Sequence, residues 1–278
     1  MIGITLSRGL LIGSGDNTEN TLLNEFGGRE KFLQTMWDEG VRSVELKPGN
    51  DISHEYKTRL AEEIKMLASV GLMVSIHSGL RDDICGAQYF EEHAFIFDLL
   101  LKNQKHLPIT IHPYTGTDIQ KTVKILRNWA EAAAGLPVKI CVENTRNQDP
   151  AVRFDEIQRL DDIIAAVDSP NVGITWDIGH HFWSRLKYPD VTPEFPSAAF
   201  LTNTAHTHIH GLEDGFVTGR THFPLLQGFM PFEDYSALLK KHGFDGVYNL
   251  ELMFSRFAEK YSFKDGLLYS IQRVRACL

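Results

Sequence analysis

The sequence predicts an α/β protein folded as a single (β/α)₈ TIM barrel over residues 1–278. Short runs rich in β-branched residues alternate with longer segments of helical periodicity, in eight strand–helix units. A hydrophobic content of 43% in 278 residues suits one barrel, a fold of about 250 residues. The main rival is a doubly wound open sheet, which usually carries a glycine-rich phosphate loop after its first strand. The stretch Gly13-Ser14-Gly15 matches such a loop poorly.

The first half of the chain alternates apolar strands with helices. Strands are expected at Ile2–Leu6, Val41–Leu46, Leu72–His77 and Ile109–His112. One helix is expected at Arg29–Glu39, closed by Gly40, and another after Ser53, which can cap it. Further helical patterns surround Phe95 and cover Thr117–Ala134.

The second half continues the alternation. Strands are expected at Val138–Glu143, Val172–Asp177, Ala205–His210 and Val247–Glu251. Helices are expected at Ile157–Val167, at Phe232–His242 and in the tail from Ser255. Specificity is expected in the loops that follow strands, since barrel enzymes build their sites there. The loops expected are Ser7–Asn24, Gly79–Phe90, Phe182–Thr202 and Glu213–Phe229.

Composition and charge narrow the classes of function. The net charge of −8 argues against a general nucleic-acid binder. No apolar run approaches the ~18 residues of a membrane span, so no membrane association is expected. Cys85, Cys141 and Cys277 show no paired spacing, which favours a reducing compartment and predicts a cytoplasmic location.

Ligand-type side chains gather at the carboxyl ends of the predicted strands. These are His77, His112, Glu143, Asp177, Glu251 and, with one parity on the seventh strand, His206, His208 and His210. Taken singly, such residues more often serve as caps, ion-pair partners or one polar face of an exposed strand. In a barrel, however, these ends meet on one face. Several carboxylates and imidazoles brought together are costly without a cation, so the pattern predicts a divalent metal site.

Six motifs carry a family resemblance over most of the chain. They are Ser75-Ile76-His77-Ser78-Gly79, Ile111-His112-Pro113, Val142-Glu143-Asn144-Thr145, Trp176-Asp177-Ile178-Gly179-His180, His206-Thr207-His208-Ile209-His210 and Asn249-Leu250-Glu251. Together they resemble the xylose isomerase-like TIM-barrel superfamily, which includes sugar-phosphate isomerases, ketose 3-epimerases and endonuclease IV. The resemblance implies a shared metal site at four positions, with His210 as the alternative to His208. Those positions are Glu143, Asp177, His208 and Glu251.

The resemblance also implies a chemistry, namely a metal-dependent isomerase or epimerase acting on a sugar, polyol or sugar phosphate through an enediolate. Glu143 and Glu251 would then be the catalytic acid and base. His180, His210 and Arg220 are expected to bind oxygens of the substrate. One divalent ion is expected, Mn²⁺ first because the ligands are rich in oxygen, with Co²⁺, Zn²⁺ and Mg²⁺ open. The expected partner is a small sugar, and the expected assembly is a homodimer, the commonest oligomer.

Two alternatives remain open from the sequence. His77 and His112 resemble the pair that, with the fifth-strand glutamate, holds an additional metal in endonuclease IV, a zinc phosphodiester hydrolase acting on abasic DNA. Where that enzyme completes a third zinc with Asp-x-His, this chain has Arg220-Thr221-His222, and an arginine cannot ligate a metal. The other alternative is a non-catalytic barrel that binds a small ligand.

Overall fold

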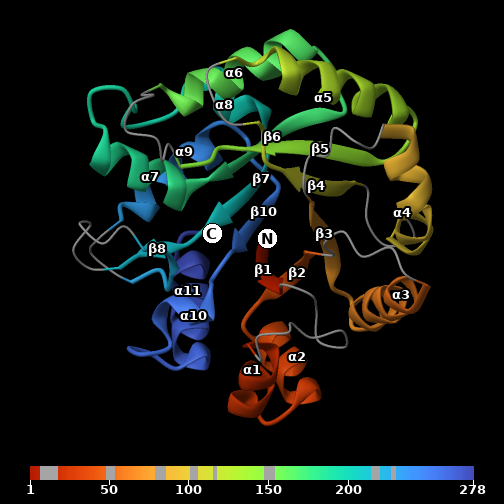
Figure 1. Cartoon of the computed structure of the whole chain (residues 1–278). Coiled ribbons are helices and arrows are strands. Elements are labelled where there is room, and N and C mark those ends of the chain that lie inside the picture. Colours follow the sequence, from red (N-terminus) through yellow and green to blue (C-terminus); the bar gives the residue numbers. More distant parts are fainter. Residues whose placement is uncertain are drawn as a thin grey trace.

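A closed barrel of eight parallel strands confirms the predicted (β/α)₈ fold (Figure 1). The computed structural model describes residues 1–6, 18–47, 54–78, 86–100, 106–114, 118–146, 154–213, 220–226 and 230–278. The strands are β1 (Ile2–Leu6), β2 (Val41–Leu46), β3 (Met73–Ser78), β4 (Leu107–Ile111), β5 (Val138–Glu143), β6 (Val172–Asp177), β7 (Thr204–Ile209) and β10 (Val247–Leu250). Around the barrel they follow the order β1-β10-β7-β6-β5-β4-β3-β2, so neighbours in sequence pair and β10 closes the ring against β1.

Helices cover the outside of the barrel (Figure 1). They are α1 (Thr18–Phe26), α2 (Arg29–Asp38), α3 (His54–Ser69), α4 (Gly86–Leu100), α5 (Gln120–Ala132), α6 (Glu156–Val167), α7 (Ile178–Lys187), α8 (Ala198–Asn203), α9 (Phe232–Lys241), α10 (Phe254–Phe257) and α11 (Phe263–Ala276). A two-stranded antiparallel sheet of β8 (Gly211–Leu212) and β9 (Thr221–Phe223) follows β7. No helix in the described part of the chain is long and apolar enough to span a membrane.

The segment after β6 corrects the sequence prediction. Phe182–Thr202 is expected as a loop, but it holds most of α7 and all of α8 except its last residue, Asn203. The Asp177 side chain accepts the backbone N–H of His180 and so begins α7, and Ser197 caps α8 in the same way. Likewise, the end of the expected loop Ser7–Asn24 is helical, in α1.

Several strands end one residue earlier than predicted. His112, His210 and Glu251 each lie just beyond the last residue of β4, β7 and β10. These residues fall outside the strands, but their side chains still lie at the carboxyl end of the barrel. The tail predicted as one closing helix is divided into α10 and α11. Ser53 and the side chain of Phe95 lie outside the described residues.

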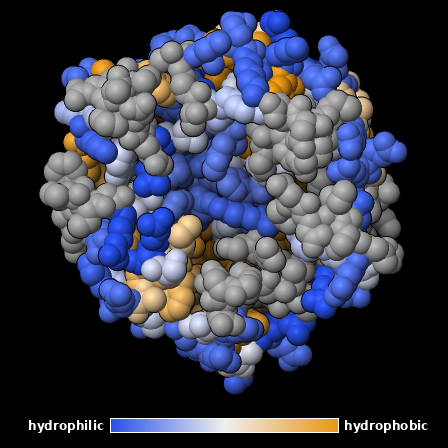
Figure 2. All heavy atoms as spheres, in the orientation of Figure 1, coloured by the Kyte–Doolittle hydropathy of each residue, from blue (hydrophilic) through white to orange (hydrophobic). Residues whose placement is uncertain are grey.

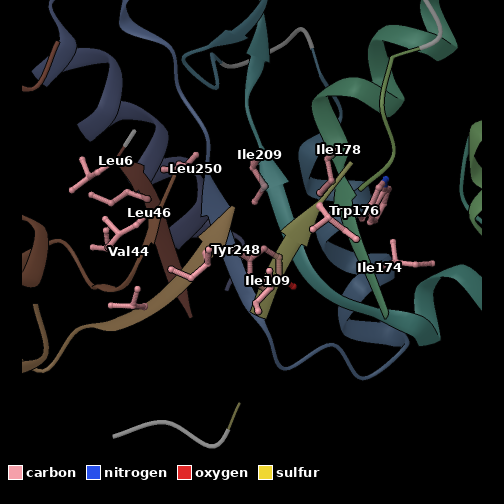
Figure 3. Close-up of a cluster of buried hydrophobic side chains, with 14 of the residues drawn as sticks. Leu6, Val44, Leu46, Ile109, Ile174, Trp176, Ile178, Ile209, Tyr248 and Leu250 are labelled. Atoms are coloured by element: carbon pink, nitrogen blue, oxygen red, sulfur yellow. The ribbon is translucent and has the colours of Figure 1, made fainter. Parts of the chain in front are cut away.

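The apolar core lies mainly between the strands and the outer helices. Figure 3 shows part of it, with Leu46, Trp176 and Ile209 among the labelled side chains, and each of these residues is buried. The inner wall of the barrel is polar instead. Thr110 on β4 and Thr175 on β6, strands that are not neighbours, bring their hydroxyl oxygens within 2.8 Å of each other across the interior.

Register explains this polar interior. Thr5 pairs with Glu45, and Asp177 with His208, so paired residues on neighbouring strands point to the same side of the sheet, here the inside of the barrel. Barrel interiors are ordinarily filled by bulky branched residues. Here the inward positions carry carboxylates, imidazoles and hydroxyls, and the carboxyl ends of the strands hold the candidate site.

Candidate metal centre

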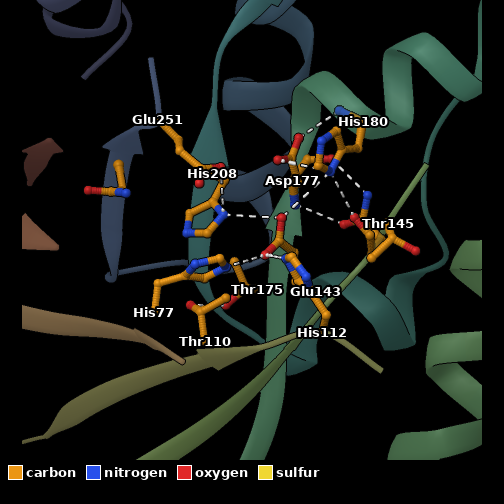
Figure 4. Close-up of polar contacts among 12 residues, drawn as sticks. His77, Thr110, His112, Glu143, Thr145, Thr175, Asp177, His180, His208 and Glu251 are labelled. Atoms are coloured by element: carbon orange, nitrogen blue, oxygen red, sulfur yellow. Dashed lines mark hydrogen bonds and ion pairs between the residues drawn. The ribbon is translucent and has the colours of Figure 1, made fainter. Parts of the chain in front are cut away.

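Four buried side chains converge at the carboxyl end of the barrel (Figure 4). Glu143 ends β5, Asp177 ends β6, His208 lies on β7, and Glu251 follows β10. Each offers a ligand atom, and these atoms all lie within 4.8 Å of one another. The structure therefore brings together the four residues expected as the shared metal site. Figure 2 shows hydrophilic atoms at the centre of this face.

His208 stands between two of the carboxylates. Its Nδ1 lies 3.2 Å from Glu143 Oε1 and 3.2 Å from Glu251 Oε2. Its Nε2 lies 3.0 Å from Glu45 Oε2, on the inner side. Burial opposes charging of the imidazole, but Glu45, Glu251 and Glu143 outweigh it and raise the pKa of His208 well above its ordinary value.

Glu143 is the most crowded carboxylate. Its Oε2 lies 3.1 Å from His77 Nε2 and 2.9 Å from His112 Nε2. Burial alone would raise the pKa of Glu143, but His208 and His112 hold it well below the ordinary value. Glu143 is therefore an ionised carboxylate, shared between the four-residue site and a second candidate cluster with His77 and His112.

Asp177 is held rigidly at the end of β6. Its backbone N–H donates to Asn144 Oδ1 at 2.8 Å, and its carbonyl accepts from Asn144 Nδ2 at 2.8 Å. Its Oδ1 caps α7 through His180 N at 2.6 Å and also lies 3.2 Å from His210 Nε2. Asp177 thus combines a helix N-cap with a place in the candidate metal site.

Residues 38–271 match the xylose isomerase-like TIM barrel family. The chain belongs to this family. It is 28% identical over 152 residues to the uncharacterized protein MJ1188 of Methanocaldococcus jannaschii, a match that covers 52% of this chain and 51% of that relative. The chain therefore matches about half the length of that curated relative.

Solved structures with the same fold include sugar epimerases. The D-allulose 3-epimerase of a Methylomonas species superposes with a TM-score of 0.62 at 14% identity, covering 100% of this chain and 98% of that one. The IolI protein, solved with a bound zinc atom, gives a TM-score of 0.59 at 16% identity, covering 99% of this chain and 97% of that one. At such identities the likeness shows the shared fold.

The donor set of this family barrel suits a divalent cation. Three carboxylates and one imidazole are ligands that Mn²⁺, Co²⁺, Zn²⁺ and Mg²⁺ accept to different degrees. Among the described residues, His208 Nδ1 and Asp177 Oδ2 are buried without a hydrogen-bond partner, although both lie near groups of opposite charge. Buried polar atoms that point at one another around a common centre fit a bound ion.

Three further imidazoles line the outer side of Asp177. The ring centroids of His180 and His210 lie 5.1 Å apart, and His222 lies 4.3 Å from His210 and 5.3 Å from His180. Burial first, and then His210, lower the pKa of His222 to about 3. Burial also lowers the pKa of His180. Neutral imidazoles at these two positions are able to accept hydrogen bonds from a sugar.

Arg220, just before β9, forms an ion pair with Glu213, just after β8. Its Nε lies 3.3 Å from Glu213 Oε2, and its side chain is about half exposed (47%). The expected contact with substrate oxygens therefore stays a prediction for this residue.

Sequence reasoning missed Glu45 and Lys47. The Glu45 carboxylate reaches across the barrel to His206 and His208. Lys47 forms an ion pair with Glu251 and, with His208, keeps the pKa of Glu251 well below its ordinary value although burial would raise it. The available signal was the alternation of Ser43 and Glu45 with apolar residues in β2, which marks an inward polar face.

Proposed function

We propose that the protein is a metal-dependent isomerase or epimerase that acts on a sugar, polyol or sugar phosphate through an enediolate. One divalent ion, with Mn²⁺ as the first choice, would be held by Glu143, Asp177, His208 and Glu251. The observation that carries the proposal is the pair of carboxylates, Glu143 and Glu251, each 3.2 Å from the same His208 nitrogen. Two such bases around one ligand centre suit removal and return of a proton.

The chemistry divides between the ion and the chain. A bound divalent ion supplies Lewis acidity, which stabilises negative charge on the oxygens of an enediolate. Glu143 and Glu251 are ionised, because neighbouring cationic groups lower both pKa values, so each is ready to accept a proton. One carboxylate would remove the proton next to the substrate carbonyl, and the other would return one. His180 and His210 would orient substrate oxygens from the Asp177 side.

We propose that the chain acts as one catalytic domain in the cytoplasm, as a homodimer, with a small sugar and no nucleic acid as its partner. Sugar epimerases among its structural neighbours support the substrate class. Cys141 and Cys277 are both free thiols, consistent with a reducing compartment.

Solvent deuterium tests this proposal directly. The Mn²⁺-loaded protein is incubated in D₂O with a panel of ketoses and ketose phosphates, and the sugars are followed by NMR. We expect one deuterium at the carbon next to the carbonyl, and loss of this exchange in Glu143→Gln and Glu251→Gln. Glu156→Gln is the control, because Glu156 is a buried carboxylate that pairs with Arg159 and belongs to none of the candidate metal groups among the described residues. Exchange at the wild-type rate in both site variants would refute the assignment.

A second candidate function has its own supporting observation. His77 and His112 both approach Glu143 Oε2, so a second ion could share that carboxylate. Paired metal ions suit phosphodiester hydrolysis at abasic DNA, as in endonuclease IV. The test is incision of an abasic duplex by the zinc-loaded protein, with His112→Ala as the variant. Incision that His112→Ala abolishes would favour the hydrolase over the isomerase.

A further inference from the structure

A buried carboxylate lies on the inner side of the candidate metal centre. Glu45 on β2 is fully buried and belongs to neither the predicted ligand set nor the catalytic pair. Its Oε2 lies 3.0 Å from His208 Nε2 and 3.1 Å from His206 Nε2. Its Oε1 accepts the hydroxyl of Thr5 at 3.1 Å. One carboxylate therefore meets three donors inside the barrel.

The contacts of Glu45 require a proton on Nε2 of His208. A carboxylate oxygen only accepts, so both histidines must present Nε2–H to it. Nδ1 of His208 is then the nitrogen left to face Glu143 and Glu251. In metal sites, a carboxylate on the far nitrogen of a histidine sets the tautomer and the ring orientation of that ligand.

Glu45 is itself braced by neighbouring strands. Thr5 on β1 donates its hydroxyl to Glu45 and accepts from Asn249 Nδ2 on β10 at 2.8 Å. The chain of hydrogen bonds thus runs from β10 through β1 and β2 to His208 on β7. A carboxylate held from both sides has little freedom to turn away from the imidazole, which makes its effect on the ring geometric as well as electrostatic.

We propose that Glu45 is a positioning residue of the metal centre, which holds His208 as the Nε2–H form and aims its Nδ1 at the ion. The proposal rests on the proposed function only for the statement that His208 binds the ion. It assigns Glu45 no contact with substrate. If Glu45 only neutralised buried imidazoles, its contacts with His206 and with His208 would matter equally. Substitution of His206 therefore serves to separate this structural role from the positioning of His208.

Mn²⁺ affinity is the first readout. Free Mn²⁺ is measured by electron paramagnetic resonance in titrations of the wild type, Glu45→Gln, His206→Gln and the control Glu156→Gln. Loss of such a partner typically weakens metal binding about 10–100-fold, and we expect a loss in this range for Glu45→Gln. The His206→Gln and Glu156→Gln proteins should keep the wild-type affinity, because neither substitution removes the carboxylate that holds His208 Nε2. Wild-type affinity in Glu45→Gln would overturn the proposal.

The second readout needs neither metal nor activity. Nitrogen-15 NMR of the imidazoles in the metal-free protein reports whether Nε2 of His208 is bonded to hydrogen and how that hydrogen is held, whether or not Nδ1 is also protonated. We expect an Nε2–H signal held by Glu45 in the wild type and a changed Nε2 signal in Glu45→Gln, with His206→Gln unchanged at His208. If Glu45→Gln does not fold, Thr5→Val removes the brace alone and should weaken Mn²⁺ binding severalfold.

The two readouts separate the proposals. A wild-type protein that binds Mn²⁺ without exchanging deuterium into any sugar contradicts the proposed function and leaves the role of Glu45 standing. A His208 signal that is the same in the wild type and in Glu45→Gln contradicts the role of Glu45, whatever the activity.

Discussion

Asp177 is predicted to serve folding and metal binding at once, and two substitutions separate these roles. Asp177→Asn keeps a side-chain oxygen that can accept the His180 N–H and so retains the N-cap of α7. It removes the charge that the ion requires. Asp177→Ala removes both the cap and the ligand. Comparing the two variants with and without Mn²⁺ isolates each contribution.

The magnitudes follow from the contacts of Asp177. Loss of an aspartate cap costs about 1 kcal/mol, so metal-free Asp177→Ala should be less stable than metal-free Asp177→Asn by about that amount. Mn²⁺ at a hundred times its dissociation constant should stabilise the wild type by about 2.7 kcal/mol. For a chain of this size that corresponds to roughly 5–10 °C in Tm. Both variants should lose most of this shift.

Thermal and urea unfolding, each with and without Mn²⁺, measure these quantities. A full Mn²⁺-dependent shift in Asp177→Asn would contradict Asp177 as a ligand. Equal metal-free stability of the Asn and Ala variants would contradict the cap that the structure gives to α7.

Three further predictions concern the surroundings of the site. Burial lowers the pKa of His181 to about 4. Below the ordinary pKa of 6.5 the unfolded chain therefore binds a proton at His181, while the folded chain stays unprotonated there down to about pH 4. The free energy of unfolding should fall by about 3 kcal/mol between pH 6.5 and pH 4. Urea unfolding at both pH values should show a smaller fall in His181→Gln than in the wild type. Gly179→Ala would place a Cβ 2.1 Å from His210 Cε1. We expect the free energy of unfolding in urea to fall by about 1–3 kcal/mol and substrate binding to weaken. Wild-type values of both would show that His210 shifts freely. If Arg220 leaves Glu213 to bind substrate, Arg220→Ala should raise KM about tenfold, or about 1.4 kcal/mol, with kcat unchanged. An unchanged KM would show that Arg220 does not bind substrate.

The sequence predicted the barrel because six of the eight predicted strands had two independent marks, an apolar run and a ligand-type residue at its carboxyl end. Val172–Asp177, for example, is a short apolar run that ends in an acid, and the structure reproduces its bounds. Such acids and imidazoles need no tertiary information to be placed at one end of a barrel, because all strands of the fold point the same way. Their convergence within 4.8 Å could be expected for that reason.

The parts that sequence could not supply depend on contacts between distant segments. The sequence marks Asp177 as the end of a strand, and only the structure shows that the same side chain also caps α7. Glu45 lies one residue before the end of β2, and its alternation with apolar residues marks an inward face but not the side chain that it meets there. Its partner His208 lies 163 residues away, and only closure of the barrel brings the two together.

The number of ions bound per chain tests the central claim most directly. The protein is purified without chelator or metal-affinity tag, and its metals are counted by mass spectrometry. We predict one Mn, Co, Zn or Mg ion per chain, lost in Glu251→Gln and retained in the control Glu156→Gln. The absence of any bound ion, with no thermal shift on adding any of the four, would contradict the metal centre, as would full retention of the ion by Glu251→Gln.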